Sequence, residues 1–290
     1  MAYLMHIGFD ISAKFWKNIF YFEYKGIRYK LIQINNKKYC DVLLTVTPDI
    51  NDQKTIDNAY KVASEYVSAL SWELNTFAKV KYLGGWGRNS PFKLRSAKCS
   101  TFEFHEIPFR GYMGKCDITR LPEVENKQQR DALILFREAR SANNDYLAFI
   151  FFWQILGIKY KDPIGWIDKV HRKYRNKIYI PNEEIQRLPL REKTLGWYLK
   201  DSRNAIAHLF SRNKGDRIIK VDTPDDNKII YCSRNIIEKF ARFYIENELN
   251  LNKRVYLVRK NGKGFPVYVN EDYMNNHYCK LAYKKPRTVF

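Results

Sequence analysis

The stretch DSRNAIAHLF, residues 201 to 210, combines residue types that could cleave a phosphodiester bond. Arg203 can bind a phosphate through two parallel hydrogen bonds and stabilise negative charge in a transition state. His208 can accept or donate a proton, because the ordinary pKa of its imidazole is about 6.5. Asn204 shares a helix face with His208 and could position the imidazole or a phosphate oxygen. These three residues predict RNA cleavage through the 2′-hydroxyl, with no metal and no cofactor.

The spacing alone is a weak indication, because an Arg five positions before a His arises by chance in many chains of this composition. The local context strengthens it. Asp201 or Ser202 could be the N-cap of a short helix, and Ala205 and Ala207 would permit close helix approach. The alternative that stays open is a structural Arg beside a His that caps a helix or packs in the core.

The charge of the chain indicates a polyanionic partner. The sequence holds 51 Lys and Arg against 31 Asp and Glu, a net charge of +20. Nucleic acid is the expected partner, with an anionic membrane surface as the competing interpretation. In the basic segment KVHRKYRNK, His171 is interpreted as a solvated or phosphate-contacting residue. The expected RNA contacts are Arg172, Lys173, Arg175, Lys177 and Arg212.

Several observations bear on the class of protein. The N-terminus has no basic segment followed by a long apolar run, and the longest apolar stretch, 146 to 158, is too short to cross a bilayer. We therefore expect a cytoplasmic chain that does not span a membrane. The five cysteines are dispersed without a C-x-x-C spacing, which predicts reduced thiols and no zinc ribbon.

Other candidate sites are rejected. In FEFHE, strand alternation places His105 on the opposite face from Glu106, which argues against a metal site. The GGWG segment at 84 to 87 lacks the glycine spacing and the following Lys-Ser or Lys-Thr of a phosphate loop.

The elements that must position these residues fall into two kinds. Residues 15 to 47 alternate apolar and polar side chains, with turn signals at Lys25-Gly26 and Asn35-Asn36, and predict a three-stranded meander. Residues 52 to 76 have a helical period, and 77 to 120 return to short strands. After Pro122 we expect helices over 127–142 and 145–157 and a basic helix following Pro163. A segment at 183–200 comes next, followed by a short helix from about Ser202 and a long helix over 233–249.

The fold class predicted is α+β. A β-rich module at 1–122 is followed by an all-α bundle at 123–250. The tail at 251–290 carries a hairpin signal at Asn261-Gly262. This hairpin could return to the N-terminal sheet or form a separate basic flap.

The helical half resembles the HEPN superfamily, whose ribonucleases carry an R-x4-6-H motif, usually with a polar residue after the Arg. It is similar in particular to the methylamine-utilisation MauJ-like family, related to HEPN domains of abortive-infection systems. The matching stretches are NNDYLAFIFFWQILGI (143 to 158), PIGWIDKV (163 to 170), LGWYLKDSRNAIAHLF (195 to 210) and IIEKFARFYIENEL (236 to 249). The resemblance covers roughly residues 123 to 250.

The resemblance implies a helical bundle that pairs across a two-fold axis, each copy contributing one Arg and one His to a shared cleft. Cleavage there is metal-independent and leaves a 2′,3′-cyclic phosphate. Arg203 corresponds to the motif Arg, Asn204 to its polar neighbour and His208 to the motif His. Some members of the superfamily bind RNA or nucleotides, or act as scaffolds, without cutting.

Two hypotheses follow. In the first, the chain is a homodimeric endoribonuclease acting on tRNA or single-stranded RNA, in antiviral defence or a toxin system, and its β-rich module regulates it, selects RNA or senses a trigger. In the second, it is a non-catalytic RNA- or nucleotide-binding partner whose helix contacts phosphate.

Overall fold

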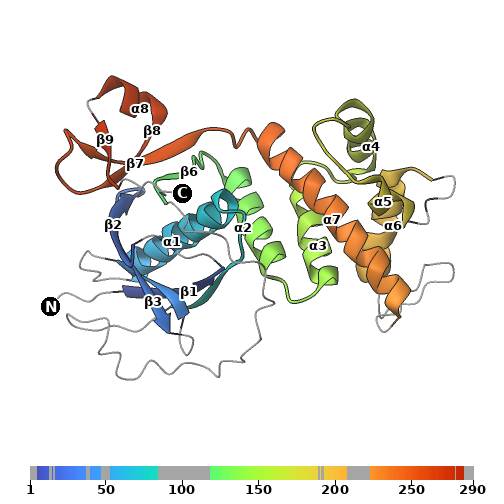
Figure 1. Cartoon of the computed structure of the whole chain (residues 1–290), viewed down its shortest axis with the longest axis horizontal. Coiled ribbons are helices and arrows are strands. Elements are labelled where there is room, and N and C mark those ends of the chain that lie inside the picture. Colours follow the sequence, from blue (N-terminus) through green and yellow to red (C-terminus); the bar gives the residue numbers. More distant parts are fainter. Residues whose placement is uncertain are drawn as a thin grey trace, which may run out of the picture. The chain divides into compact units, whose positions relative to one another are not determined.

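The computed structural model describes residues 5–12, 15, 17–36, 40–46, 53–83, 118–188, 190, 193–207, 223–277 and 279–283. The chain forms two compact units (Figure 1). The sheet unit comprises Met1–Glu125 and Asn252–Phe290, and the helical unit comprises Asn126–Leu251. The fold is α+β, as the sequence predicted. The boundaries of independent domains stay a prediction.

One mixed sheet forms the centre of the sheet unit, in the order β5-β1-β4-β3-β2-β8-β7-β6, with β9 paired to β7. All pairings are antiparallel except a single parallel bridge between β2 and β8, at Glu23 and Val267. The strands are β1 (Met5–Ile11), β2 (Ile19–Tyr24), β3 (Ile27–Asn36), β4 (Cys40–Val46), β5 (Ala78–Leu83), β6 (Arg120–Pro122), β7 (Arg254–Lys260), β8 (Val267–Asn270) and β9 (Cys279–Leu281).

The predicted meander is confirmed as β2, β3 and β4, which are neighbours in the sheet. Its first turn is at Lys25-Gly26, where φ is 49° and 77°, the left-handed values that a tight hairpin turn requires. The second turn was placed too early, because β3 continues to Asn36 and pairs there with Cys40. Strand β1, which pairs with both β4 and β5, was not predicted.

Helix α1 (Gln53–Glu73) confirms the predicted helix and covers one face of the sheet (Figure 1). Its fully buried residues Ala63, Tyr66 and Val67 meet the inward side chains of β2, which include Phe22. The rings of Phe22 and Tyr66 are stacked with centroids 4.7 Å apart. The core of this unit is therefore a layer of aromatic and aliphatic side chains between one helix and one sheet.

The C-terminal strands return to the sheet, which decides between the two arrangements that the sequence left open. Strands β7 and β8 form an antiparallel pair, and Asn261-Gly262 turns the chain after β7 with φ of 52° and 70°. Helix α8 (Glu271–Asn276) and strand β9 were not predicted. The candidate strands between 84 and 117, with GGWG and His105, lie outside the described residues.

The helical unit confirms the predicted helices as α2 (Lys127–Ser141), α3 (Asp145–Leu156) and α4 (Ile164–Lys173). They are followed by α5 (Asn182–Gln186), α6 (Leu195–Ala207) and α7 (Pro224–Asn247). Helix α7 begins nine residues before the predicted start at 233. Thr223 precedes it, Pro224 occupies its first turn, and Asp225 and Asp226 lie beside the positive end of the helix dipole.

Helix α3 is the centre of the bundle and packs against α2, α6 and α7. It is apolar around most of its circumference, as a helix with neighbours on several sides must be. Phe136 of α2 and Phe152 of α3 are fully buried, with ring centroids 5.6 Å apart. The apolar run 146–158 is therefore a core helix, as predicted, and no helix within the described ranges is long and apolar enough to cross a membrane.

Candidate functional site

Helix α6 carries the first two residues of the predicted motif. It begins after Thr194, whose hydroxyl oxygen accepts a hydrogen bond from the backbone N–H of Trp197 at 3.3 Å. Thr194 is therefore the N-cap, and the prediction of Asp201 or Ser202 was wrong. Ser202 lies in the middle of the helix and is fully buried. The reason is packing, because apolar residues at helical spacing continue through this point: Leu195, Tyr198, Leu199, Ala205 and Ile206.

Arg203 and Asn204 lie next to this buried face and are partly exposed. The guanidinium Nη1 of Arg203 donates a hydrogen bond to Oδ1 of Asn204 at 3.0 Å. Asn204 therefore orients the guanidinium, whereas the sequence suggested that it positions an imidazole or a phosphate. An arginine held in this way, with part of its surface in solvent, is suited to bind an anionic oxygen.

The other members of the predicted site, His208 and Arg212, lie outside the described residues. Their catalytic and RNA-binding roles stay predictions. His171, the other histidine of the helical unit, is on α4. Burial lowers the pKa of His171, the positive charge of Arg175 lowers it further, and Asp168 opposes both. Its imidazole is consequently held towards the neutral form.

Helix α6 is fixed against α4 at Gly196. The carboxylate Oδ1 of Asp168 accepts a hydrogen bond from the Gly196 backbone N–H at 2.8 Å, satisfying one of the free N–H groups at the helix start. The two backbones are in close approach, since a Cβ on Gly196 would lie 2.6 Å from the carbonyl oxygen of Ile164. One turn later, Lys200 Nζ lies 2.6 Å from Asp162 Oδ2. The hydrogen bond from Lys200 lowers the pKa of Asp162.

These contacts give the direction of the two helices. Gly196 meets Asp168 and Ile164, whereas Lys200, further along α6, meets the earlier residue Asp162. The helices thus run in opposite directions. Gly196, Lys200 and Arg203 are four and three positions apart and lie along one side of α6, so Arg203 is on the side that meets the start of α4.

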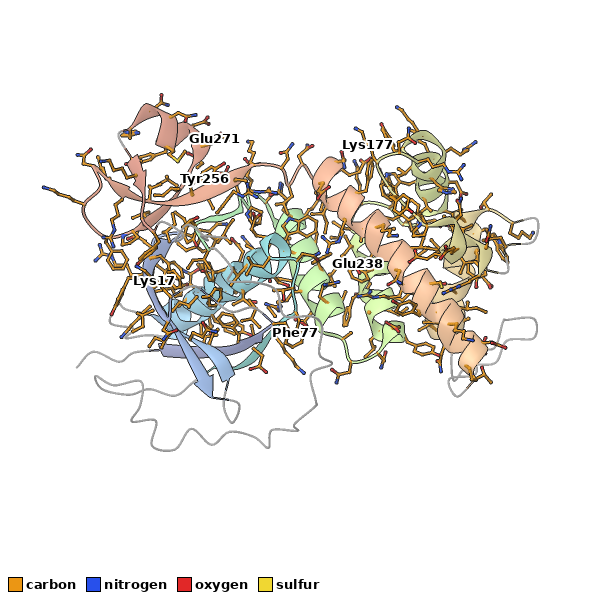
Figure 2. The ribbon with its side chains drawn as sticks, in the orientation of Figure 1. Lys17, Phe77, Lys177, Glu238, Tyr256 and Glu271 are labelled. Atoms are coloured by element: carbon orange, nitrogen blue, oxygen red, sulfur yellow. The ribbon has the colours of Figure 1, made fainter. Side chains whose placement is uncertain are left out.

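The basic residues predicted to bind RNA are at the other end of this helix pair. Arg172 and Lys173 are exposed in the last turn of α4, and Arg175 and Lys177 (labelled in Figure 2) are exposed just after it. Arg203 is seven residues beyond Gly196, about 10 Å along α6 in the opposite direction. The structure does not bring them together with Arg203, and their binding of RNA stays a prediction.

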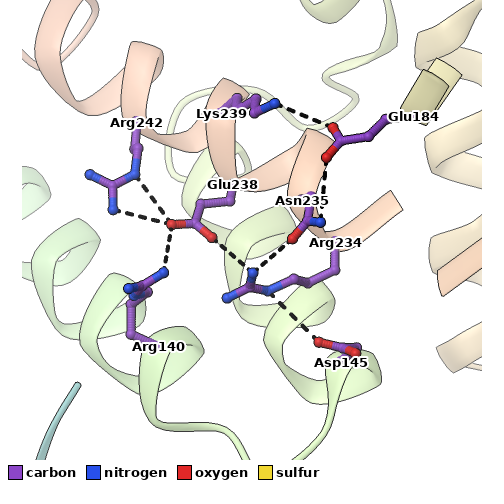
Figure 3. Close-up of polar contacts among 8 residues, drawn as sticks. All are labelled: Arg140, Asp145, Glu184, Arg234, Asn235, Glu238, Lys239 and Arg242. Atoms are coloured by element: carbon purple, nitrogen blue, oxygen red, sulfur yellow. Dashed lines mark hydrogen bonds and ion pairs between the residues drawn. The ribbon is translucent and has the colours of Figure 1, made fainter. Parts of the chain in front are cut away.

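A buried cluster of charges joins α2, α3 and α7 (Figure 3), and the sequence analysis did not find it. Oε1 of Glu238 accepts hydrogen bonds from Arg140 and Arg242, each with a distance of 3.1 Å. Oε2 of the same carboxylate lies 3.1 Å from Nη1 of Arg234. Asp145 of α3 is 3.9 Å from Nε of Arg234. This cluster holds the face of α7 that packs against α2 and α3.

The pKa of Glu238 depends on its burial and on the three arginines around it. Burial is the largest single influence and raises the pKa, because the charged form loses water. The guanidinium groups of Arg234, Arg140 and Arg242 together outweigh burial, so the pKa is lowered. Glu238 is therefore a carboxylate that remains ionised inside the unit. Its spacing from Arg234 and Arg242, four residues on either side, is the signal that the sequence offered.

A second carboxylate ties α4 to α7. Glu248, directly after α7, accepts hydrogen bonds from Nε1 of Trp166 at 3.1 Å and from the hydroxyl of Tyr160 at 3.2 Å. The hydrogen bond from Trp166, the largest influence that favours ionisation, lowers its pKa together with Lys159. This contact fixes α4, and α4 in turn fixes α6. Within the part of the chain that the structure describes, no group of His, Cys, Asp and Glu has the arrangement of a metal site.

Comparison with known proteins matches part of the helical unit. The family model described as methylamine utilization protein MauJ matches residues 132–246, from α2 to the end of α7. MauJ-like proteins are HEPN-like, and the matched range includes Arg203, Asn204 and His208. The sheet unit lies outside the match. Neither a curated protein nor a solved structure matches the chain.

Proposed function

We propose that the chain is a metal-independent endoribonuclease whose reaction takes place at α6. The observation that carries the proposal is the partly exposed guanidinium of Arg203, oriented by Asn204 on a helix that Asp168 and Gly196 fix. His208 follows at R-x4-H spacing within the segment that is similar to MauJ. The net charge of +20 supports RNA as the substrate.

In the proposed reaction the ribose 2′-oxygen attacks phosphorus while His208 takes the hydroxyl proton. The bond from phosphorus to the 5′-oxygen breaks, and a protonated histidine donates a proton to that oxygen. The product ends are a 2′,3′-cyclic phosphate and a 5′-hydroxyl. Arg203 binds the nonbridging oxygens as negative charge develops. One motif histidine per chain favours a homodimer, in which a second copy supplies the proton donor.

The second candidate is an RNA- or nucleotide-binding partner that does not cut. The hydrogen bond from Nη1 of Arg203 to Asn204 would orient the guanidinium for phosphate binding as well as for catalysis, so it is compatible with this candidate too. A role in antiviral defence or as a toxin in the cytoplasm belongs to the first proposal and rests on family analogy.

The test is to incubate the purified chain with tRNA and with single-stranded RNA in EDTA and to identify the product ends. Cyclic-phosphate ends are expected from the wild type. Loss of the proton-transfer group in His208→Ala should slow cutting by about 10²- to 10⁴-fold while RNA binding persists. Arg203→Ala should lose rate and some affinity.

Matched controls are available in the same chain. Arg187→Ala removes an exposed arginine near α5, and His277→Ala removes an exposed histidine of the sheet unit. Both should cut like the wild type. Equal cutting by the wild type and His208→Ala would indicate a contaminant, and binding without any cutting would favour the second candidate. Light scattering should show a dimer, and a strict monomer that cuts would contradict a shared site.

A further inference from the structure

One face of the β2 and β3 pair carries exposed side chains of two kinds. Along β2 exposed and buried residues alternate, so that Phe20 and Phe22 face α1 while Tyr21, 43% exposed, faces away from it. Along β3 Arg28 and Lys30 flank the buried Tyr29 and face the same way as Tyr21. This outward face therefore presents an aromatic ring and two cations side by side.

Each exposed ring on this face has a cation beside it. Nζ of Lys30 lies 5.6 Å from the centroid of the Tyr21 ring, its partner across the strands. Cζ of Arg28 lies 5.1 Å from the ring of Phe265, which is 36% exposed and lies between β7 and β8. Lys30 and Arg28 are two residues apart on one strand, about 7 Å. Two ring and cation pairs thus follow one another along the sheet.

The C-terminal segment packs at the edge of β2, where the buried Tyr283 lies with its ring 5.1 Å from that of Phe20. The hydroxyl of Tyr283 accepts a hydrogen bond from the Tyr21 backbone N–H and donates one to its carbonyl oxygen, both at 3.0 Å. Lys17 (labelled in Figure 2) lies with its Nζ 4.9 Å from the Tyr283 ring, and Arg259 lies 5.9 Å from it. Because the ring of Tyr283 packs against Phe20 on the α1 side, the cations that the outward face itself presents are Arg28 and Lys30. Glu23 on the same face is paired with Arg28 at 3.3 Å.

Exposed apolar side chains of the sheet unit gather in the same region. Among the described residues of this unit, the large hydrophobic side chains that are exposed all belong to β2, to the turn after β7 or to β9: Ile19, Tyr21, Phe265 and Leu281. Exposed rings that are grouped with cations mark an interaction surface more strongly than scattered ones do.

We propose that this surface, the outward face of β2 and β3 with Phe265, binds single-stranded nucleic acid. Bases stack on Tyr21 and Phe265, and phosphates contact Arg28 and Lys30. The proposal goes beyond cleavage at α6, because it assigns binding to the sheet unit and holds whether or not α6 cuts. A single strand offers both flat bases and phosphates, whereas a duplex hides its base faces and would leave the rings unused.

The experiment measures binding of the full chain to a fluorescein-labelled 2′-O-methyl oligouridylate in EDTA by anisotropy. This probe has no free 2′-hydroxyl, so a failure of binding is distinguishable from a failure of cleavage. Tyr21→Ala and Phe265→Ala should each weaken binding about tenfold, because each removes one stacking platform. Tyr21→Phe keeps the ring and should bind like the wild type. Lys30→Gln should weaken binding and reduce its dependence on salt.

Lys61→Gln is the matched charge control, because Lys61 is exposed on α1, which covers the opposite face of the sheet. It should leave affinity within about twofold of the wild type. Unchanged affinity in the Tyr21→Ala/Phe265→Ala double variant, with thermal melting that shows a folded protein, would overturn the proposal. Tighter binding to a duplex of the same chemistry would also overturn it. So would variants that lose binding to phosphatidylserine vesicles and keep the wild-type affinity for the oligouridylate.

Discussion

The two units each bury a glutamate, and they neutralise it differently. In the sheet unit Glu65 is 2% exposed, with Lys25 Nζ at 2.6 Å and the Tyr24 hydroxyl donating to it at 2.9 Å. In the helical unit Glu238 is 8% exposed and is surrounded by three arginines. Among the contacts of the described residues, the cation beside Glu65 is Lys25, whereas three arginines surround Glu238.

This difference shows what each unit depends on. Lys25 is 38% exposed and can turn to water if its partner is lost. Arg234 is 8% exposed, its ring neighbour is Phe152, and its Nε and Nη2 are buried without a hydrogen-bond partner in the described structure. Since an unpaired buried charge costs far more than an exposed one, the helical unit depends on its glutamate and the sheet unit on its aromatic core.

The sharpest test of this comparison is to neutralise each glutamate in turn. Glu238→Gln should lower the free energy of unfolding of the helical unit by about 3–5 kcal/mol, because buried arginines lose their counterion. Glu65→Gln should cost about 1–2 kcal/mol, because the amide can still accept from Tyr24. Hydrogen exchange of the full chain, followed separately in α7 and α1, measures both. Equal losses in the free energy of unfolding would contradict this difference between the two units.

The lowered pKa of Glu238 also predicts how the stability of the helical unit changes in acid. Because the folded pKa of Glu238 is lowered, its contribution is complete above the ordinary carboxyl pKa of about 4.3 and is lost as pH falls through the folded value. The protection of the α7 amides, after correction for the intrinsic exchange rate, should therefore fall below about pH 4.3, and Glu238→Gln should flatten this dependence. Glu246→Gln, an exposed change on the same helix, is the control and should keep the wild-type slope.

Two glycines test whether packing or charge fixes α6. Gly196→Ala should cost about 1–3 kcal/mol, because its Cβ would meet the Ile164 carbonyl oxygen. Gly165→Ala on α4 has open space around its Cβ and should stabilise that helix by up to about 1 kcal/mol. Chemical denaturation compares the two variants. A neutral Gly196→Ala would mean that α4 and α6 can separate freely.

The smallest effect is expected from the ion pair between the same helices. The Lys200 and Asp162 side chains are 41% and 49% exposed, so Lys200→Met should lower stability by less than about 1 kcal/mol. Thermal denaturation at low and high salt measures the change. A loss as large as that of Gly196→Ala would show that charge, and not close backbone contact, holds α6.

Much of the fold could be predicted where a pattern repeats within one element. The helical spacing of α1 and the alternation of β2 were sufficient, and Lys25-Gly26 specified the turn. The start of α6 was missed because Asp201 and Ser202 resemble caps, while burial of Ser202 continues the helix through them. Spacing also found Arg203 and Asn204, but it could not show that one orients the other.

By itself the sequence determined the α+β class, the cationic charge and the Arg203 motif, since composition and short periodicities express them directly. Only the tertiary structure decided which strands are neighbours, and it brought Tyr283 to the backbone of Tyr21 across 262 residues. It also brought Arg140 to Glu238 across 98 residues. Such contacts depend on burial and loop closure over the whole chain, and no local pattern of residues carries that information.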